Sequence, residues 1–525
     1  MSRRTLLVLA VVASAALSCG RDSRAASRRC APLGLDAFAT CGASTGAAPP
    51  SPGAAWSTDS RSLLTPESFA GGSAEVTLAE GERAAIFVLN AGGRDGATAR
   101  VEARNVAPPP ARSTVQSSIA AASLPLPPGD AGVLELTRSL GPLPGRGAAA
   151  LRQRSAAAAA PPERTTFCVL SRSDYSTSAR RAGILVAEGM HAAVYVDETG
   201  LQDLSAGEAL ALADAFDGRI HPRLTALLGP PSDVDGNGKV ILFLTTLPQL
   251  WGYYWANDVL YPRDASDGCT GSRSNAVDAV YLALPSSVTR LGWTRAEALG
   301  ELIPGVLAHE YAHLLSFQRR CLARACDGAD ETWIEEGLAK VAEDEAGYGW
   351  NSARAGGITY LTRTREDVYR GYDGRSLTRW EGDSVGNYEG AHAFFRFHAD
   401  RLGPDILASL TSGSTGIANV ERALGTSFPE ALADVATALL FSNTGASPAA
   451  DHSFTGAGWT PLGDKLRLLD AVPLGDGAPA AASLRADGWN AFLTGRAGPG
   501  GGAVRIASGE AVKPWVAVVR FTGDL

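Results

Sequence analysis

The sequence has little of several residue types, and each scarcity excludes a class of protein. Charged residues make up only 19% of the 525 positions, and the 55 acidic residues outnumber the 47 basic ones. This balance removes the electrostatic basis for nucleic-acid binding and leaves no polybasic patch for a membrane surface. Beyond the N-terminus no run reaches the ~18 apolar residues of a membrane-spanning helix. With 45% hydrophobic residues the chain is globular, and its length predicts three or four domains.

The first 19 residues have the pattern of an export signal. Basic residues precede an apolar stretch from Leu6 to Leu17 that is too short to span a bilayer. Ala13-Ser14-Ala15 is typical of a cleavage site, whereas the residues up to Cys19 are similar to the lipid-attachment motif of bacterial lipoproteins. We therefore expect an exported protein that is either secreted or anchored through a lipid on Cys19, its only expected membrane contact. Lipidation would leave six of the seven cysteines for up to three disulfides.

Composition divides the rest of the chain into five segments. Residues 20–55 are rich in Ala, Ser, Gly and Pro and predict a disordered tether. Short alternating segments in 56–106 predict a small β domain, and the Pro/Ala-rich stretch 107–163 is a linker or a propeptide. Residues 164–445 form the main domain, and 446–525 read as a C-terminal β module.

The main domain is expected to be α+β. Ala192–Val196, Lys239–Thr245 and Asp278–Leu284 have the apolar runs of buried strands, and a capping box at Ser205 opens a long helix. Helical patterning then continues from about Thr294 onward. Strands followed by helices predict a mixed-sheet lobe and a helical lobe with the site between them, flanked by the small β domains.

One short segment carries chemistry. His309-Glu310-Tyr311-Ala312-His313 is an H-E-x-x-H pattern, and a sequence with only 7 histidines matches it by chance in about 0.5% of cases. Residues four apart lie on one face of a helix, so both imidazoles can bind one zinc ion while Glu310 faces a water on that metal. The pattern predicts zinc chemistry with Glu310 as general base.

A catalytic zinc needs a third protein ligand and keeps one position for water. Glu336 and Glu343, seven residues apart in a helix-compatible stretch, share one face, whereas Glu335 is turned about 100° away. The spacing alone leaves several downstream acidic residues open as the third ligand. These are Asp327, Asp330, Glu331, Glu335 and Glu336.

Trp333–Ala339 resembles the W-L-N-E-G-F-A segment of gluzincin aminopeptidases. That resemblance implies Glu336 as the third zinc ligand and Glu343 as its support. The spacer between the two zinc segments is longer here than in the aminopeptidases, and it contains Cys321 and Cys326, which can close a small disulfide loop.

A wider resemblance, to the hyicolysin-like neutral zinc metallopeptidases, covers roughly 165–442. It includes Asp233–Val240, Gly252–Trp255, Ser274-Asn275 and the Tyr-x-Gly-Ala pattern in Asn387–Phe395. It implies a two-lobed zincin-like fold and a peptidase acting on proteins or peptides. Cleavage of internal bonds is favoured because no G-x-M-E-N-like exopeptidase motif precedes the zinc helix. The alternatives are an aminopeptidase and a cell-surface binding protein with a structural or vestigial metal site.

Two further assignments stay open. The oxyanion donor is Tyr388 by its resemblance to the aminopeptidase tyrosine, with His392, one helical turn later, as the rival. The Asp233-x-Asp235-x-Asn237-Gly238 pattern imitates half of a calcium loop, but Leu244 stands where the bidentate Glu belongs. A tight turn into the following strand is therefore favoured over a calcium site.

Overall fold

The protein is represented by a computed structural model, which describes most of the chain beyond residue 60. The described residues are 61–107, 133, 136, 160–322, 328–349, 376–380, 385–411, 414–442, 444, 446, 452–454, 471–509 and 512–523. The predicted signal (1–19), Cys19 and the tether (20–55) lie outside them. So do Cys326, Asp327 and nearly all of the predicted linker.

A six-stranded mixed sheet forms the first lobe, in the order β5-β6-β7-β8-β10-β9. Neighbours β7, β8 and β10 run parallel, and the other pairs are antiparallel. Parallel strands covered on both faces read as continuous apolar runs, which is why these three segments were recognisable in the sequence. The strands are β5 (Arg164–Leu170), β6 (Ser178–Glu188), β7 (Ala192–Asp197), β8 (Val240–Thr245), β9 (Gly252–Tyr254) and β10 (Ala279–Ala283).

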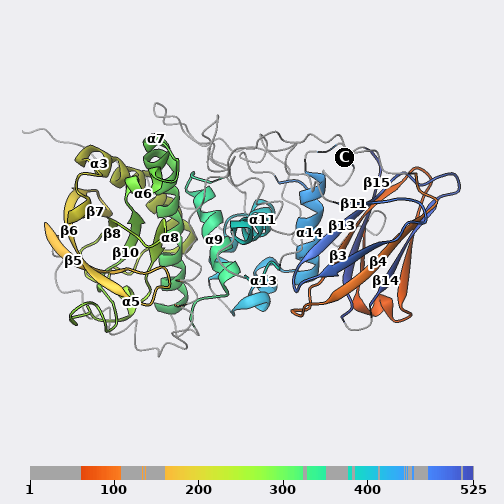
Figure 1. The fold of residues 1–525 in the computed structure, drawn as a ribbon, viewed down its shortest axis with the longest axis horizontal. Coiled ribbons are helices and arrows are strands. Elements are labelled where there is room, and N and C mark those ends of the chain that lie inside the picture. Colours follow the sequence, from red (N-terminus) through yellow and green to blue (C-terminus); the bar gives the residue numbers. More distant parts are fainter. Residues whose placement is uncertain are drawn as a thin grey trace, which may run out of the picture. The chain divides into compact units, whose positions relative to one another are not determined.

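Helices make up the second lobe and cover the sheet (Figure 1). Ser205 and Glu208 form the predicted capping box before the first long helix. The helix α8 packs against β9 and β10 on one side and against α9 on the other, so it separates the two lobes. The longer helices are α3 (Ala206–Ala215), α4 (His221–Leu228), α8 (Ile303–Phe317), α9 (Thr332–Glu345), α11 (Val385–Leu402), α13 (Gly416–Leu424) and α14 (Phe428–Phe441). Shorter ones are α5 (Asn257–Leu260), α6 (Pro285–Thr289), α7 (Arg295–Glu297) and α12 (Ile406–Leu410). The α+β prediction is confirmed.

The two ends of the chain share one β-sandwich, which we call the terminal sandwich. One sheet has the order β1-β15-β3-β13-β11 and the other β12-β4-β14-β2. Figure 1 accordingly shows orange N-terminal strands between blue C-terminal ones. Its strands are β1 (Arg61–Leu64), β2 (Ser73–Leu78), β3 (Arg83–Leu89), β4 (Ala97–Arg104), β11 (Val472–Leu474), β12 (Ala480–Leu484), β13 (Trp489–Thr494), β14 (Gly502–Ser508) and β15 (Trp515–Phe521).

This arrangement corrects the expectation of two separate β modules at 56–106 and 446–525. Each segment alone leaves strands with unpaired edges, and pairing across the chain ends satisfies their backbone groups. Thus β3 lies between β13 and β15, and β14 lies between β2 and β4. The predicted domain boundaries otherwise remain predictions.

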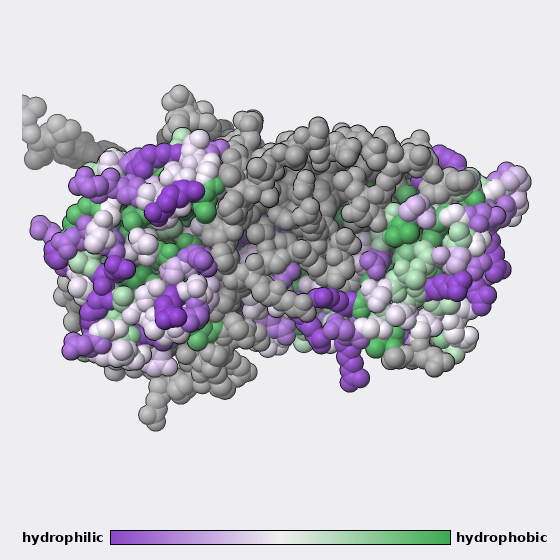
Figure 2. Space-filling model, in the orientation of Figure 1, coloured by the Kyte–Doolittle hydropathy of each residue, from purple (hydrophilic) through white to green (hydrophobic). Residues whose placement is uncertain are grey.

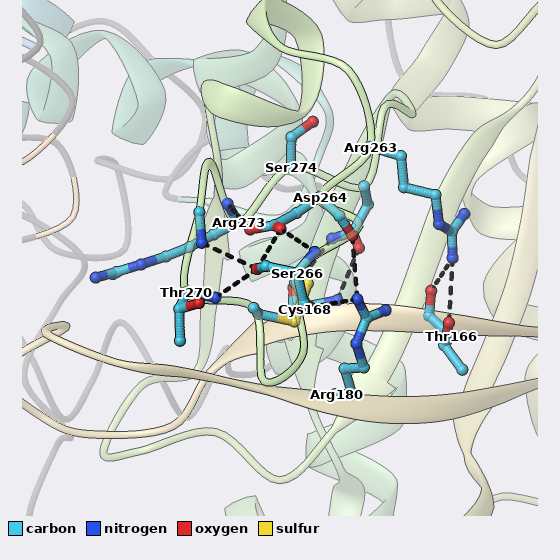
Figure 3. Close-up of a disulfide and its surroundings, with 12 residues drawn as sticks. Thr166, Cys168, Arg180, Arg263, Asp264, Ser266, Thr270, Arg273 and Ser274 are labelled. Carbon is cyan, nitrogen blue, oxygen red and sulfur yellow. Dashed lines mark hydrogen bonds between the residues drawn. A yellow bond between two sulfur atoms is a disulfide. The ribbon is translucent and has the colours of Figure 1, made fainter.

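A disulfide ties β5 to the long loop before β10. Cys168 bonds Cys269, and Figure 3 shows the polar contacts around this bridge. Arg180 on β6 donates to the backbone oxygens of Asp264 and Ser266, at 3.2 and 2.6 Å. Cys321 is also disulfide-bonded, and its predicted partner lies outside the described residues.

Among the described residues, no helix is both long and apolar enough to cross a membrane. Hydrophilic residues cover much of the described surface in Figure 2. The large hydrophobic side chains exposed in the described part come from four different segments of the chain. They are Met190, Leu210, Tyr261 and Val472.

Candidate metal centre

Helix α8 carries the H-E-x-x-H segment in its middle. The predicted capping box at Thr294 starts α7, and Pro304 lies in the first turn of α8. The two predicted helices are joined by a π-helical turn at Ala298–Leu302 into one run. Because α8 lies between the sheet and α9, its histidines and Glu310 are buried.

His309 and His313 converge with Glu336 of α9 on one point. The Nε2 atom of His309 lies 2.9 Å from Glu336 Oε2, and that of His313 lies 3.6 Å from the same oxygen. Their potential ligand atoms all lie within 4.8 Å of one another. Ligands at zinc distances of ~2.0–2.2 Å stand roughly 3.3–3.6 Å apart in a tetrahedral site. Two imidazoles and one carboxylate at these separations fit one zinc ion. We call these three residues the metal cluster.

The electrostatics of the cluster favour a bound cation. Burial by itself raises the pKa of Glu336, but hydrogen bonds and charge from His309 and His313 lower it to about 2. Burial by itself lowers the pKa of His309, but bonds to Glu336 and Glu343 raise it well above its usual value. Because the carboxylate stays ionised beside them, the imidazole nitrogens can bind either protons or a metal ion.

Two residues of α9 support His309 from behind. Glu343 Oε1 lies 2.8 Å from His309 Nδ1, which leaves Nε2 to face Glu336. Lys340 donates to the other Glu343 oxygen at 3.0 Å and lies 3.7 Å from Glu389 of α11. Sequence reasoning missed Lys340. Its signal was a lysine on the helix face shared by Glu336 and Glu343, four residues after the first and three before the second.

The other proposed third ligands have different partners. Asp330 accepts from Arg320 at 2.7 Å and from Asn419 at 2.6 Å. Glu331 accepts from the indole nitrogen of Trp333 at 2.8 Å. Glu335 accepts from Ser316 and from the backbone of Asp330. None of these three belongs to the metal cluster among the described residues.

The two candidate oxyanion donors on α11 have different neighbours. Tyr388 donates to Glu336 Oε1 at 3.2 Å, which places its hydroxyl at the metal cluster. His392 Nε2 lies 2.8 Å from Asp344, and its Nδ1 lies 3.7 Å from Glu389. Burial lowers the pKa of His392, but the charge of Asp344 raises it above the usual value overall. The arrangement brings Tyr388, and not His392, to the cluster.

Two glycines allow the elements around the site to approach closely. A Cβ on Gly337 of α9 would lie 2.3 Å from the Phe395 ring of α11. A Cβ on Gly252 of β9 would lie 2.6 Å from Val306 and 3.0 Å from Glu310 Cγ. Side chains at these positions would push α11 away from α9 and β9 away from α8. Sequence reasoning recorded both glycines without recognising this role.

The calcium-like segment is a turn in the structure. The Asp233 carboxylate accepts from the Gly238 amide at 2.9 Å, and Asp235 accepts from the Asn237 side chain at 2.7 Å. Asp233, Gly236 and Gly238 have positive φ, as a tight turn into β8 requires. The side chains of Asp233, Asp235 and Asn237 thus each make a hydrogen bond within the turn.

No family model matches the chain. The neutral metalloprotease ShpI of Staphylococcus hyicus is 24% identical over 263 residues, which is 46% of this chain and 53% of that protein. The chain therefore spans about half the length of this curated relative. The protein is thus similar to a metalloprotease, and its His309, His313 and Glu336 form a cluster that could hold a metal ion.

Proposed function

We propose that this protein is an exported zinc peptidase of the gluzincin type that hydrolyses peptide bonds. The observation that carries the proposal is the convergence of His309, His313 and Glu336 from two helices, with Glu310 buried in the same turn of α8. The similarity to a metalloprotease supports the reaction class. The peptide substrate and the export route, secreted or lipid-anchored, belong to the proposal.

His309, His313 and Glu336 would hold the zinc ion, and Glu343 with Lys340 would fix the orientation of His309. Bound zinc supplies a Lewis acid that polarises the scissile carbonyl and acidifies water.

Glu310 takes the proton from the attacking water and transfers it to the leaving amine. A buried carboxylate suits this role because its surroundings admit little competing water. The Tyr388 hydroxyl, at the edge of the cluster, donates a hydrogen bond to the oxygen of the tetrahedral intermediate. His392, held by Asp344 and Glu389, orders the neighbouring turn of α11.

Internal peptide bonds are the preferred target, and an aminopeptidase is the in-class alternative. A binding protein that uses the same metal cluster only for structure is the alternative from another class. Glu310 distinguishes either peptidase from the binding protein, because only turnover needs a general base beside the cluster.

The test replaces Glu310 by Gln in the full chain, loads the protein with zinc and measures casein hydrolysis. We expect the rate to fall about 10²–10⁴-fold while the zinc content stays unchanged, since Gln keeps the shape but cannot take a proton. Glu301→Gln, in the π-helical turn before α8, is the matched control and should leave the rate unchanged. Persistent hydrolysis in the Glu310→Gln protein would contradict the mechanism.

A further inference from the structure

The terminal sandwich holds a short segment, residues 376–380, that precedes α11. The amide of Leu377 donates to the backbone oxygen of Asp487 at 3.1 Å, and the hydroxyl of Thr378 donates to the Asp487 carboxylate. Arg379 donates to the backbone oxygen of Gly93 and lies 3.7 Å from Asp95. These partners lie in the β3–β4 and β12–β13 connections, each of which passes from one sheet of the sandwich to the other, and we call these two connections the corner.

The corner is itself well fixed. Asp487 is buried at 2% exposure, and its amide donates to Asn90 at 2.6 Å. The Asn90 side chain in turn donates to the backbone oxygens of Arg94 and Arg485. The two connections are therefore bonded to each other as well as to the segment.

The last residue of the segment reaches the metal cluster through one aromatic contact. The rings of Trp380 and Tyr388 have centroids 4.8 Å apart, inclined at 56°. The Trp380 indole nitrogen donates to Leu377 at 3.0 Å, which fixes the indole against its own segment. Tyr388, in the first turns of α11, then donates to Glu336 at 3.2 Å. A continuous series of contacts thus joins the sandwich corner to a residue of the metal cluster.

We propose that Trp380 is a positioning residue for the Tyr388 hydroxyl, and that the terminal sandwich is part of the catalytic unit because its corner fixes Trp380. This inference rests on the proposed function, in which Tyr388 is the oxyanion donor. Such a donor is effective only when it is held in place before the reaction, since a shift of about 1 Å can cost ~10²-fold in rate.

The remainder of α11 has its own support. Glu389 and His392 contact Lys340 and Asp344 of α9, and the Phe395 ring packs on Gly337. The helix is therefore fixed without Trp380, and loss of the indole should release the Tyr388 ring and leave the fold intact.

The first test is a double-mutant cycle on the zinc-loaded full chain. Trp380→Ala should lower kcat for a casein-derived peptide about 10–100-fold, with KM and zinc content unchanged. Trp380→Phe keeps a ring beside Tyr388 and should retain most of the rate. In a Tyr388→Phe background Trp380→Ala should have no further effect, because the indole acts only through that hydroxyl. An equal loss in both backgrounds overturns the proposal.

The second test does not depend on activity. Tyr388 labelled as 3-fluorotyrosine reports on its surroundings through its ¹⁹F resonance, which Trp380→Ala should shift. Asp487→Gly should shift it too, because glycine tolerates the positive φ of 54° at this position and removes only the side chain. Asp476→Ala is the control, since Asp476 bonds Asn105 within the sandwich and does not belong to the corner.

A resonance unchanged in either Trp380→Ala or Asp487→Gly overturns the proposal whatever the activity. If the unsubstituted protein does not hydrolyse the peptide, the proposed function fails by itself, and the ¹⁹F result still decides whether the sandwich positions Tyr388.

Discussion

Glu335 and Glu336 are neighbours in α9, and they belong to two different buried clusters. Glu336 belongs to the metal cluster with His309 and His313. Glu335 belongs to what we call the anchor cluster, which consists of Arg320, Asp330, Glu335 and Asn419. The metal cluster joins α9 to the middle of α8, and the anchor cluster joins α9 to the residues just after α8. Both clusters are almost fully buried.

The anchor cluster supplies its own cation. Arg320 lies 2.7 Å from Asp330 and 3.8 Å from Glu335, and it also donates to the backbone oxygen of Leu410 at 2.7 Å. The other Asp330 oxygen accepts from the Gly416 amide at 2.7 Å. The guanidinium therefore pairs with both carboxylates, and amides donate to their oxygens, as buried charges require.

The metal cluster is as deeply buried, but its carboxylate is paired with two imidazoles. Its nitrogens and carboxylate oxygen converge on one point instead of alternating with a guanidinium. Burial and acidic composition therefore do not by themselves mark a metal site. The convergence of ligand atoms on one point marks the metal cluster. Glu335 and Glu336 are consecutive residues that point about 100° apart on α9, so they enter different clusters.

The largest expected effect tests this difference directly with the neighbouring pair. Glu336→Gln should weaken zinc binding by more than the ~10–100-fold typical of indirect supports and should abolish hydrolysis. Glu335→Gln should leave zinc binding unchanged and lower the free energy of unfolding by about 1–3 kcal/mol, because its bonds to Ser316 and Asp330 are disturbed. Zinc titration calorimetry and urea denaturation measure the two quantities. Equal zinc affinities in the two variants would refute the assignment of Glu336.

The support of His309 should give the next largest effect. Glu343→Gln and Lys340→Met should each reduce zinc affinity, by about 10–100-fold for Glu343, since the carboxylate orients the imidazole and the ammonium holds the carboxylate. Glu345→Gln is the matched control, because that carboxylate bonds Arg396 at 3.0 Å. An affinity in Glu343→Gln equal to that of the control would show that His309 needs no support.

The histidine pair of the metal cluster could be predicted from the sequence because its geometry is local. His309 and His313 are one turn apart in a single helix, and Glu336 followed from the resemblance of its segment. The strands β7, β8 and β10 were predictable for a similar reason, since a covered strand is apolar throughout.

Long-range pairing left no local signal. Each strand of the terminal sandwich looks the same whether it pairs with its neighbour or with a strand from the other end of the chain, so the sequence suggested two modules. Trp380 was missed for the same reason, because only the folded chain brings its ring beside Tyr388. The contact of Lys340 with Glu389 also depends on the fold, whereas its bond to Glu343 is local to α9.

The zinc affinity and the stability of the metal cluster should both depend on pH. The raised pKa of His309 means that zinc must displace a proton, so zinc affinity should rise with pH up to that raised value. Calorimetry in buffers of different ionisation enthalpy counts the protons released. In the metal-free protein, the stability contributed by His309 is complete below its unfolded pKa of ~6.5 and is lost as pH rises through the raised folded value.

The contribution of Glu336 to stability changes with pH in the opposite direction. Its folded pKa of about 2 means that its contribution is present above the ordinary glutamate value and is lost as pH falls toward 2. Of these two groups only His309 titrates above neutrality, so the metal-free protein should lose stability as the pH rises. The zinc-bound protein should gain stability over the same range, because zinc binds the deprotonated imidazole. Parallel behaviour of the two forms in thermal denaturation would contradict a proton and a metal competing for the cluster.

The smallest effect tests whether the clusters are independent. Ser316 lies on α8 three residues after His313 and donates to Glu335 Oε2 at 3.0 Å. Ser316→Ala removes one donor to a buried carboxylate, which should cost about 1–2 kcal/mol of unfolding free energy with zinc affinity and kcat unchanged. Thr437→Val, which removes a bond from Thr437 to Ala433 within α14, should cost less because no charged group loses a partner. If Ser316→Ala weakened zinc binding as well, the two clusters would be coupled through α8. Glu335 and Glu336 would then belong to one shared network.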